Sequence, residues 1–203
     1  MKFPHFLLNL KAMKKLMPLI IMLFCGAFTN AQSNLKEKTV KVLPSSGLTI
    51  TGDTNINKFT CVFDTSFLRE PQAIGYSDNG SVISFSNARL RLHTKGFDCG
   101  SRPINRDFKE LIKADEYPEI VLELNKVNLK DRSSGIANIC IKIAGKQKYY
   151  DVPVAIKTGE VAEFKGRMEL NINDFGLKPP KKLFGIIVVK DDIQINFDLK
   201  VKK

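Results

Sequence analysis

The sequence predicts an antiparallel all-β domain of about eight strands with one short helical insert. Apolar and polar residues alternate in steps of two along most of the chain after position 45, which gives each strand one apolar face. The segments between these runs are too short for crossover helices, which indicates antiparallel neighbours. The exception is residues 97–118, where a turn precedes a helical run.

A sheet with a single apolar face must cover that face. It can do so by folding into a sandwich or by closing into a barrel, and closure also removes the exposed edges. The periodicity by itself does not choose between the two architectures.

Residues 1–31 have the composition of a secretory signal peptide. Four lysines and no acidic residue precede an apolar run from Leu16 to Phe28, and Thr29-Asn30-Ala31 fits a small-x-small cleavage site. The run is shorter than the ~20 apolar residues of a membrane-spanning helix. A start at Met13 would also give a complete signal. We therefore expect a periplasmic or secreted protein.

Removal of the signal would leave 172 of the 203 residues, which fits one domain. We expect residues 32–45 to form a polar leader and residues 46–203 to form the folded domain. The formal charge of +11 would fall to +7, because four lysines leave with the signal. Acidic and basic residues are interspersed, which indicates a solvated surface, with transient contact with an anionic membrane as the alternative. No basic stripe with interleaved aromatic residues suggests nucleic acid.

The expected strands follow one another along the domain. The last run is the clearest, because Ile193, Ile195 and Phe197 alternate with polar residues. Between the third and fourth runs, Asn79-Gly80 is a strong hairpin signal. In the second run, every second residue from Phe59 to Phe67 is expected to share one face. The runs are residues 46–52, 58–67, 72–76, 81–94, 119–127, 136–145, 148–156, 162–172 and 192–201.

The insert at residues 97–118 reads as a short helix between two strands. Asp107 followed by Glu110 fits a capping box at a helix N-terminus. Tyr117-Pro118 is expected to end the helix, because the residue before proline avoids helical geometry. The insert is either a lid over the interior or a plug for one end of the sheet, since small barrels need their ends covered.

Three cysteines remain after signal removal: Cys61, Cys99 and Cys140. An oxidising compartment favours a disulfide, and the odd number leaves one thiol. We expect Cys61 to pair with Cys99, which would tie the start of the insert to an early strand. Cys140 lies in mid-strand on the face opposite its neighbouring isoleucines, where a bridge to a distant loop is harder to build.

The residues that catalysis needs are sparse. The domain holds a single histidine, His93, which continues the polar set of Arg89 and Arg91 on an alternating strand. A metal site or a nucleophilic arrangement would have to be built from that one imidazole. No nucleotide-binding or hydrolase motif is present. We therefore expect no enzyme, no cofactor and no metal site.

Four stretches, in order, resemble the YceI-like family of exported lipid-binding proteins: SGLTITGDTNINKF, FKELIKADEYPEIVLEL, IKIAGKQKYYDVPV and FKGRMELNINDFGLKPP. The resemblance covers roughly residues 46 to 201. Two family motifs carry it most clearly. They are matched by Ile112, Lys113, Ala114, Asp115, Tyr117, Pro118 and Ile120, and by Phe164, Gly166, Asp174, Phe175 and Gly176.

The resemblance implies a lipocalin-like barrel whose apolar interior holds an isoprenoid chain, such as a polyprenyl lipid or a quinone tail, for carriage or sequestration. An eight-stranded barrel is near the size at which side chains either fill the centre or leave room for one ligand. The alternative is therefore a secreted interaction or structural module with a filled core. Arg102 and Arg106 are the candidates for contact with a head group. The residues expected to line the interior are Phe59, Phe63, Leu122, Ile141, Val154, Phe164, Met168, Leu170, Ile193, Ile195 and Phe197.

Overall fold

The structure is a computed structural model that describes residues 35–68, 70–179 and 188–202. The expected signal peptide lies outside these residues. Strands dominate the described part of the chain, which confirms the all-β class with a short helix. The strands found there are β1 (Lys36–Val42), β2 (Gly47–Thr54), β3 (Lys58–Phe63), β4 (Gln72–Asp78), β5 (Val82–Ser86), β6 (Arg89–His93), β7 (Phe97–Asp98), β8 (Glu119–Leu129), β9 (Ser134–Ile143), β10 (Lys146–Lys157), β11 (Val161–Asn171) and β12 (Val189–Lys202).

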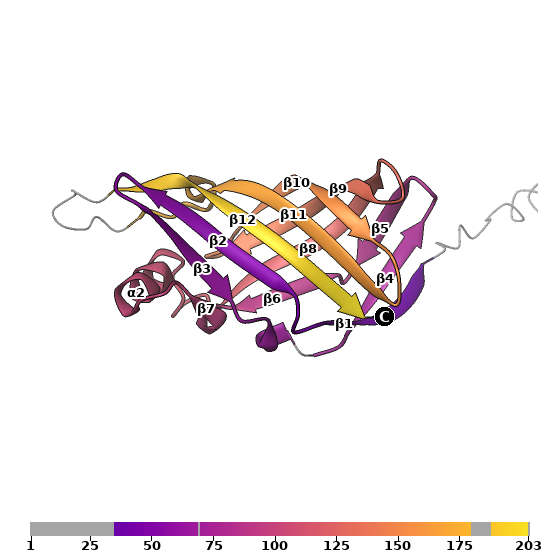
Figure 1. Ribbon diagram of the computed structural model, residues 1–203, viewed down its shortest axis with the longest axis horizontal. Coiled ribbons are helices and arrows are strands. Elements are labelled where there is room, and N and C mark those ends of the chain that lie inside the picture. Colours follow the sequence, from indigo (N-terminus) through magenta and orange to yellow (C-terminus); the bar gives the residue numbers. More distant parts are fainter. Residues whose placement is uncertain (1–34, 69, 180–187, 203) are drawn as a thin grey trace, which may run out of the picture. The chain divides into compact units, whose positions relative to one another are not determined.

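Eight of these strands, within the described ranges, close into a ring (Figure 1). Its order is β1-β4-β5-β8-β9-β10-β11-β12, and β12 pairs back with β1 through Val42 and Val201. Every pairing in the ring is antiparallel. Closure joins the two outer strands, β1 and β12, which would otherwise be edges of an open sheet. The structure therefore selects the barrel, and the expected lipocalin-like architecture is confirmed.

Four further strands extend the wall at one end of the barrel. β2 pairs with β12, β3 with β2 and β7 with β3, while β6 pairs with β8. The 3₁₀ turn η2 (Thr94–Gly96) joins β6 directly to β7. His93 caps this turn, since its Nδ1 accepts a hydrogen bond from the Lys95 amide at 3.2 Å. The chain then runs from β7 into the helix that covers this end of the barrel (Figure 1).

The helix α2 spans Arg102–Leu111 and begins earlier than predicted. Its N-cap is Ser101, whose hydroxyl accepts from the Ile104 amide, with Pro103 in the first turn. The predicted cap at Asp107 is wrong, because that residue lies inside the helix. Ser101 is a preferred N-cap residue, and proline fits the first turn, where the backbone N–H groups have no intrahelical partner. These two signals outweigh the Asp107–Glu110 pair.

Two other strand boundaries differ from those predicted from the alternation of apolar and polar residues. β3 ends at Phe63, and the 3₁₀ turn η1 (Thr65–Leu68) follows, so Phe67 is 47% exposed instead of continuing the inner face. The run predicted over residues 81–94 is split into β5 and β6, with Asn87 at a φ of 59° between them. The hairpin at Asn79-Gly80 is confirmed, because β4 and β5 pair across it and Gly80 has a φ of 90°.

Residues 36–42 are not a leader. They form β1, which pairs with β4 from Lys36 to Val40 and with β12 at Lys41 and Val42. This strand closes the ring. Its polar composition hid it from the alternation, because five of its seven residues are Lys, Glu or Thr.

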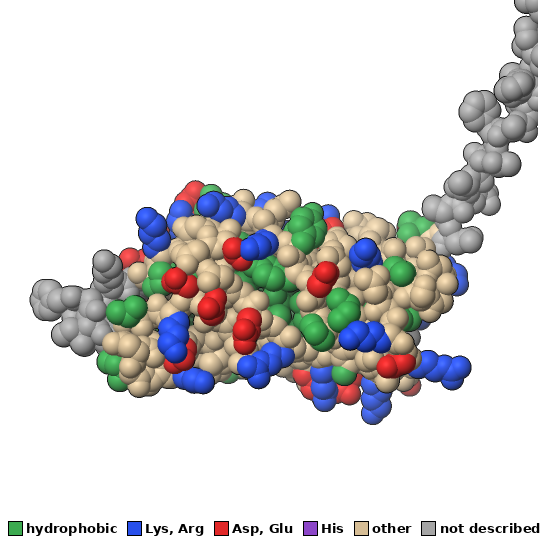
Figure 2. Space-filling model, turned by 90° about the horizontal axis from the view of Figure 1, so that it is seen from above, with side chains coloured by type: hydrophobic (Ala, Val, Ile, Leu, Met, Phe, Trp, Pro, Cys, Tyr) green, Lys and Arg blue, Asp and Glu red, His purple; other side chains and the backbone are tan. Residues whose placement is uncertain are grey.

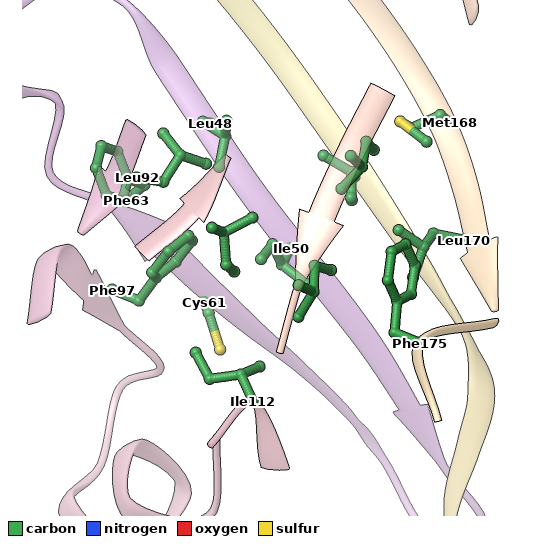
Figure 3. Packing of buried hydrophobic residues seen from close by; sticks show 14 of the residues in the cluster. Leu48, Ile50, Cys61, Phe63, Leu92, Phe97, Ile112, Met168, Leu170 and Phe175 are labelled. Carbon is green, nitrogen blue, oxygen red and sulfur yellow. The ribbon is translucent and has the colours of Figure 1, made fainter. Parts of the chain in front are cut away.

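Much of the core lies toward the α2 end of the barrel, and it extends to Val127 and Ala137 near the turn that joins β8 to β9. Phe108 and Ile112 of the insert, 8% and 4% exposed, belong to it, and Ile112 lies beside Cys61 of β3 (Figure 3). The ring centroids of Phe63 and Phe97 are 4.9 Å apart, and those of Phe97 and Phe108 are 5.1 Å apart. The insert therefore contributes to the core as well as to the surface.

Candidate functional site

The pairing registers define the inward face of the barrel. Ile195 of β12 lies opposite Ile50 on one side and Met168 on the other, and all three are buried. Side chains alternate between the two faces of a strand, so every second residue from such a position points inward. By this criterion, all eleven residues predicted to line the interior lie on the inward face.

The eleven residues differ in burial. Six are at most 7% exposed and belong to the core: Phe63, Ile141, Val154, Met168, Leu170 and Ile195. The other five are only partly buried: Phe59, Leu122, Phe164, Ile193 and Phe197.

The end of the barrel opposite α2 has a partly exposed apolar inner face. We call this end the mouth. It is formed by β1 and by the turns that join β4 to β5, β8 to β9 and β10 to β11 (Figure 1). Seven inward residues near it are of intermediate exposure, and none of them belongs to the core or to the side chains packed against it. These mouth residues are Val40, Ile74, Tyr76, Ile83, Phe164, Leu199 and Val201.

The opposite end is closed by side chains. Besides α2, the 3₁₀ turn η3 (Ile172–Phe175) buries Ile172 and Phe175 to 2% exposure. Tyr150 holds this turn, because its hydroxyl donates to Asp174 at 3.1 Å and its ring stacks near Phe175. The family motif around Asp174 thus serves as part of a plug.

The charges around η3 stabilise this arrangement. Lys148 forms an ion pair with Asp174, and its hydrogen bond, with a smaller contribution from Tyr150, lowers the pKa of the Asp174 carboxyl. Burial, followed by the hydrogen bond to Asp174, raises the pKa of the Tyr150 hydroxyl. Both groups therefore keep their ordinary protonation states at neutral pH. Nothing in this cluster suggests a general acid or base.

The predicted disulfide between Cys61 and Cys99 is confirmed, and Cys140 is a free, buried thiol. Cys61 is 0% and Cys99 is 5% exposed. The bridge links β3 to the segment that enters α2, so it fixes the plug to the wall.

Arg102 and Arg106 lie away from the mouth. Both are exposed on α2 and line an outer hollow of about 730 Å³. Every residue that lines this hollow comes from residues 102–116, which carry four basic and four acidic side chains. The structure therefore does not bring the two arginines together with the partly exposed apolar residues, and their contact with a head group stays a prediction.

A second hollow, of about 350 Å³, lies where β10 and β11 separate. Their pairing runs from Val154–Gly166 to Lys157–Glu163, although both strands continue toward η3. Val152 and Met168 form the floor of the hollow and are 1% and 7% exposed. Inward side chains therefore close the wall at this point.

The alternation missed several inward residues near the mouth. They lie on β1, β4 and β5, whose short runs are bounded by polar residues. The pattern Lys36, Lys38, Val40, Val42 at every second position of β1 was a signal, but its first half is charged. Such a strand becomes recognisable only when its pairing partners are known.

Among the described residues, no three His, Cys, Asp or Glu side chains are grouped so that they could hold a metal ion. The helices within the described ranges include none that is long and apolar enough to cross a membrane.

Solved structures of other proteins have a similar fold. Two solved structures resemble the chain closely enough to show the fold. Burkholderia cenocepacia BcnA has a TM-score of 0.60 and 19% identity, over 78% of this chain and 96% of that one. A polyisoprenoid binding domain from Saccharophagus degradans, implicated in plant cell wall breakdown, has a TM-score of 0.57 and 10% identity, over 80% of this chain and 97% of that one.

A search of curated proteins gives no match. The family model of the YceI-like domain matches residues 29–201, which include nearly all of the barrel and both motifs noted in the sequence. The chain therefore belongs to the YceI-like domain family.

Proposed function

We propose that this protein is an exported binding protein, and not an enzyme, that holds the isoprenoid chain of a polyprenyl lipid or a quinone in its barrel for carriage or sequestration. Membership of the YceI-like family and the fold shared with a polyisoprenoid binding domain support a lipid ligand. The disulfide supports a periplasmic or secreted location, because such bonds persist in oxidising compartments.

The observation that carries the proposal is the contrast between the two halves of the interior. In a filled barrel, inward apolar side chains would be buried at both ends. Here the side chains near α2 are mostly buried, whereas toward the mouth seven are only partly buried, although Val127, Ala137 and Ala162 are buried among them. An apolar ligand would cover this remaining surface. Burial of one five-carbon isoprene unit contributes on the order of 3 to 4 kcal/mol before ordering costs, so a few units suffice for tight binding.

The division of the interior assigns roles to the predicted residues. Of the partly buried ones, Phe164 and Phe197 lie toward the mouth and are proposed to touch the chain directly, whereas Phe59, Leu122 and Ile193 lie nearer the α2 end beside the buried ones. The six buried ones are proposed to form the floor on which the chain ends. Transfer of the ligand would involve a transient contact with a membrane surface. On the face shown in Figure 2, acidic and basic side chains are interspersed with apolar ones, so such a contact would be weak.

Lipid extraction and mass spectrometry of the purified protein test the proposal directly. A co-purified isoprenoid is the expected result. A second test compares geranylgeraniol binding by two variants of β9. Ile139 is inward and partly buried, whereas Lys142 is exposed on the opposite face. Ile139→Trp should weaken binding at least tenfold by filling the interior, while Lys142→Trp should bind like the wild type.

The packed half of the interior favours a second candidate function, a secreted interaction or structural module with a filled core. Absence of any extracted lipid, together with no geranylgeraniol binding by the wild type, would favour this candidate and contradict the first. The variant Leu199→Glu distinguishes loss of ligand binding from loss of folding. Its side chain is only partly buried, so a carboxylate stays hydrated and the variant should fold but not bind.

A further inference from the structure

The inner face of β1 changes from apolar to basic toward the mouth. Val42 lies opposite Val201 of β12, and Val42 packs against the core. Every second residue of β1 lies on the same face as Val42, and toward the mouth these residues are Val40, Lys38 and Lys36. The polarity of this face therefore changes between Val40 and Lys38.

A second pairing confirms that the two lysines share the inward face. Lys38 lies opposite Ile74 and Lys36 opposite Tyr76 of β4. Tyr76 in turn lies opposite Phe85 of β5, which packs against the core. Residues directly opposite each other on paired strands point to the same face. The pairings of β1 with β12 and with β4 thus both place the two lysines on the inward face, at the outer end of the mouth.

The two ammonium groups have no acidic partner in the described part of the chain. Neither lysine forms a salt bridge there, whereas Lys190, Lys165 and Lys202 pair with carboxylates. The nearest inward carboxylate on β4 is Asp78, which accepts the Gly80 amide of the hairpin turn at 2.8 Å. Glu37 lies between the lysines in sequence and points to the other face. Among the described residues, the inner rim therefore presents two cations without a salt bridge, with Asp78 as an acidic neighbour on the same face.

We propose that Lys36 and Lys38 bind the anionic head group of an amphiphile whose apolar chain lies against the mouth residues. This inference rests on the proposed function and deepens it: the ligand carries a phosphate or carboxylate, not a neutral alcohol or a quinone ring. The Tyr76 hydroxyl, on the same face opposite Lys36, adds a neutral donor. Charge-assisted hydrogen bonds to an anion are stronger than neutral ones. The opposite end is closed by α2 and η3, so a polar head can stay in water only at the mouth.

The test compares two probes that differ only in the head: geranylgeranyl phosphate and geranylgeraniol. Delipidated wild-type protein should bind the phosphate roughly fivefold to tenfold more tightly in calorimetry, since two exposed ammonium groups each contribute modestly. Salt should reduce this preference. The double variant Lys36→Gln/Lys38→Gln should bind both probes with the affinity that the wild type has for the alcohol.

Two controls locate the effect. Lys41→Gln changes the outward face of the same strand and should keep the preference. Arg102→Gln/Arg106→Gln tests the helix end and should also keep it. A preference lost in the arginine variant but retained in the lysine variant would overturn the inference and place the head group at α2. Geranylgeranoic acid carries the same chain with a carboxylate head. If it binds as tightly as the phosphate, the negative charge of the head group, and not the phosphate itself, accounts for the preference.

The failure of this inference is distinguishable from that of the proposed function. Equal wild-type affinity for the phosphate and the alcohol would reject the anionic head group while supporting a chain-binding interior. No binding of either probe would reject both. Because Lys36 and Lys38 are exposed, the glutamine variants should fold, and an unchanged melting temperature would establish this.

Discussion

Gly166 and Phe197 lie opposite each other on β11 and β12, and the ring of Phe197 occupies the space that a side chain at Gly166 would need. A Cβ built on Gly166 would stand 2.3 Å from Cζ of Phe197. The same relationship recurs between Gly52 and Phe59 on β2 and β3. In both pairs, the absence of a side chain lets a phenyl ring lie over the glycine.

Gly166→Ala should therefore destabilise the barrel. The ring of Phe197 must move, and overpacking of this kind costs about 1 to 3 kcal/mol, or roughly 2 to 4 °C in melting temperature for each kcal/mol. Calorimetry measures the shift. Phe197→Leu in the same chain should restore most of the stability by removing the clash. A double variant less stable than both single variants would contradict this account.

Loss of the disulfide should be costly. It closes a loop with a sequence separation of 38, and in the chain-entropy model this contributes about 4 kcal/mol. Cys61→Ala/Cys99→Ala should lower the free energy of unfolding by about that amount in a denaturant titration. Cys140→Ala is the matched control for a buried cysteine outside the bridge. A loss as large in the control would mean that packing, and not the bridge, accounts for the effect.

The plug should respond to acid. The pKa of Asp174 lies below its ordinary value of 3.8, first because of Lys148 and then because of Tyr150. A carboxyl with a depressed pKa in the folded state stabilises the fold above its unfolded pKa, and this stability is lost as the pH falls through the folded pKa. Asp174→Asn should therefore flatten the fall in stability below about pH 4. Thermal unfolding from pH 2 to pH 7 checks this, and an unchanged slope would remove Asp174 as a cause.

Ligand binding should protect the mouth and not the helix. Phe108 and Ile112 anchor the insert in the core, which favours a plug over a lid. Hydrogen exchange in β1 and β4 should slow when geranylgeraniol is added, because local opening there exposes the ligand. Exchange across Arg102–Leu111 should stay the same. Slower exchange confined to the helix would instead make α2 the lid.

The sequence by itself determined which side chains face inward along most of the regular strands. The alternation through Ile193, Ile195 and Phe197 fixes their face whatever the neighbouring strand is, because side-chain direction along a strand has a period of two. The hairpin at Asn79-Gly80 was equally readable, since the turn chemistry is local. The disulfide partners were predicted from the position of Cys99 at the start of the insert and from the mid-strand position of Cys140.

Only the tertiary structure decided how the sheet closes and where its interior is filled. β1 is recognisable as a strand through its partners β4 and β12, which lie far away in the sequence. The burial of Leu170 and the partial exposure of Phe164 differ although both residues sit on the same face of β11. The two-residue periodicity shows which face of the sheet a side chain lies on, but not how deeply that side chain is buried. Depth depends on what α2 and η3 bring to one end of the barrel and on what is left uncovered at the other.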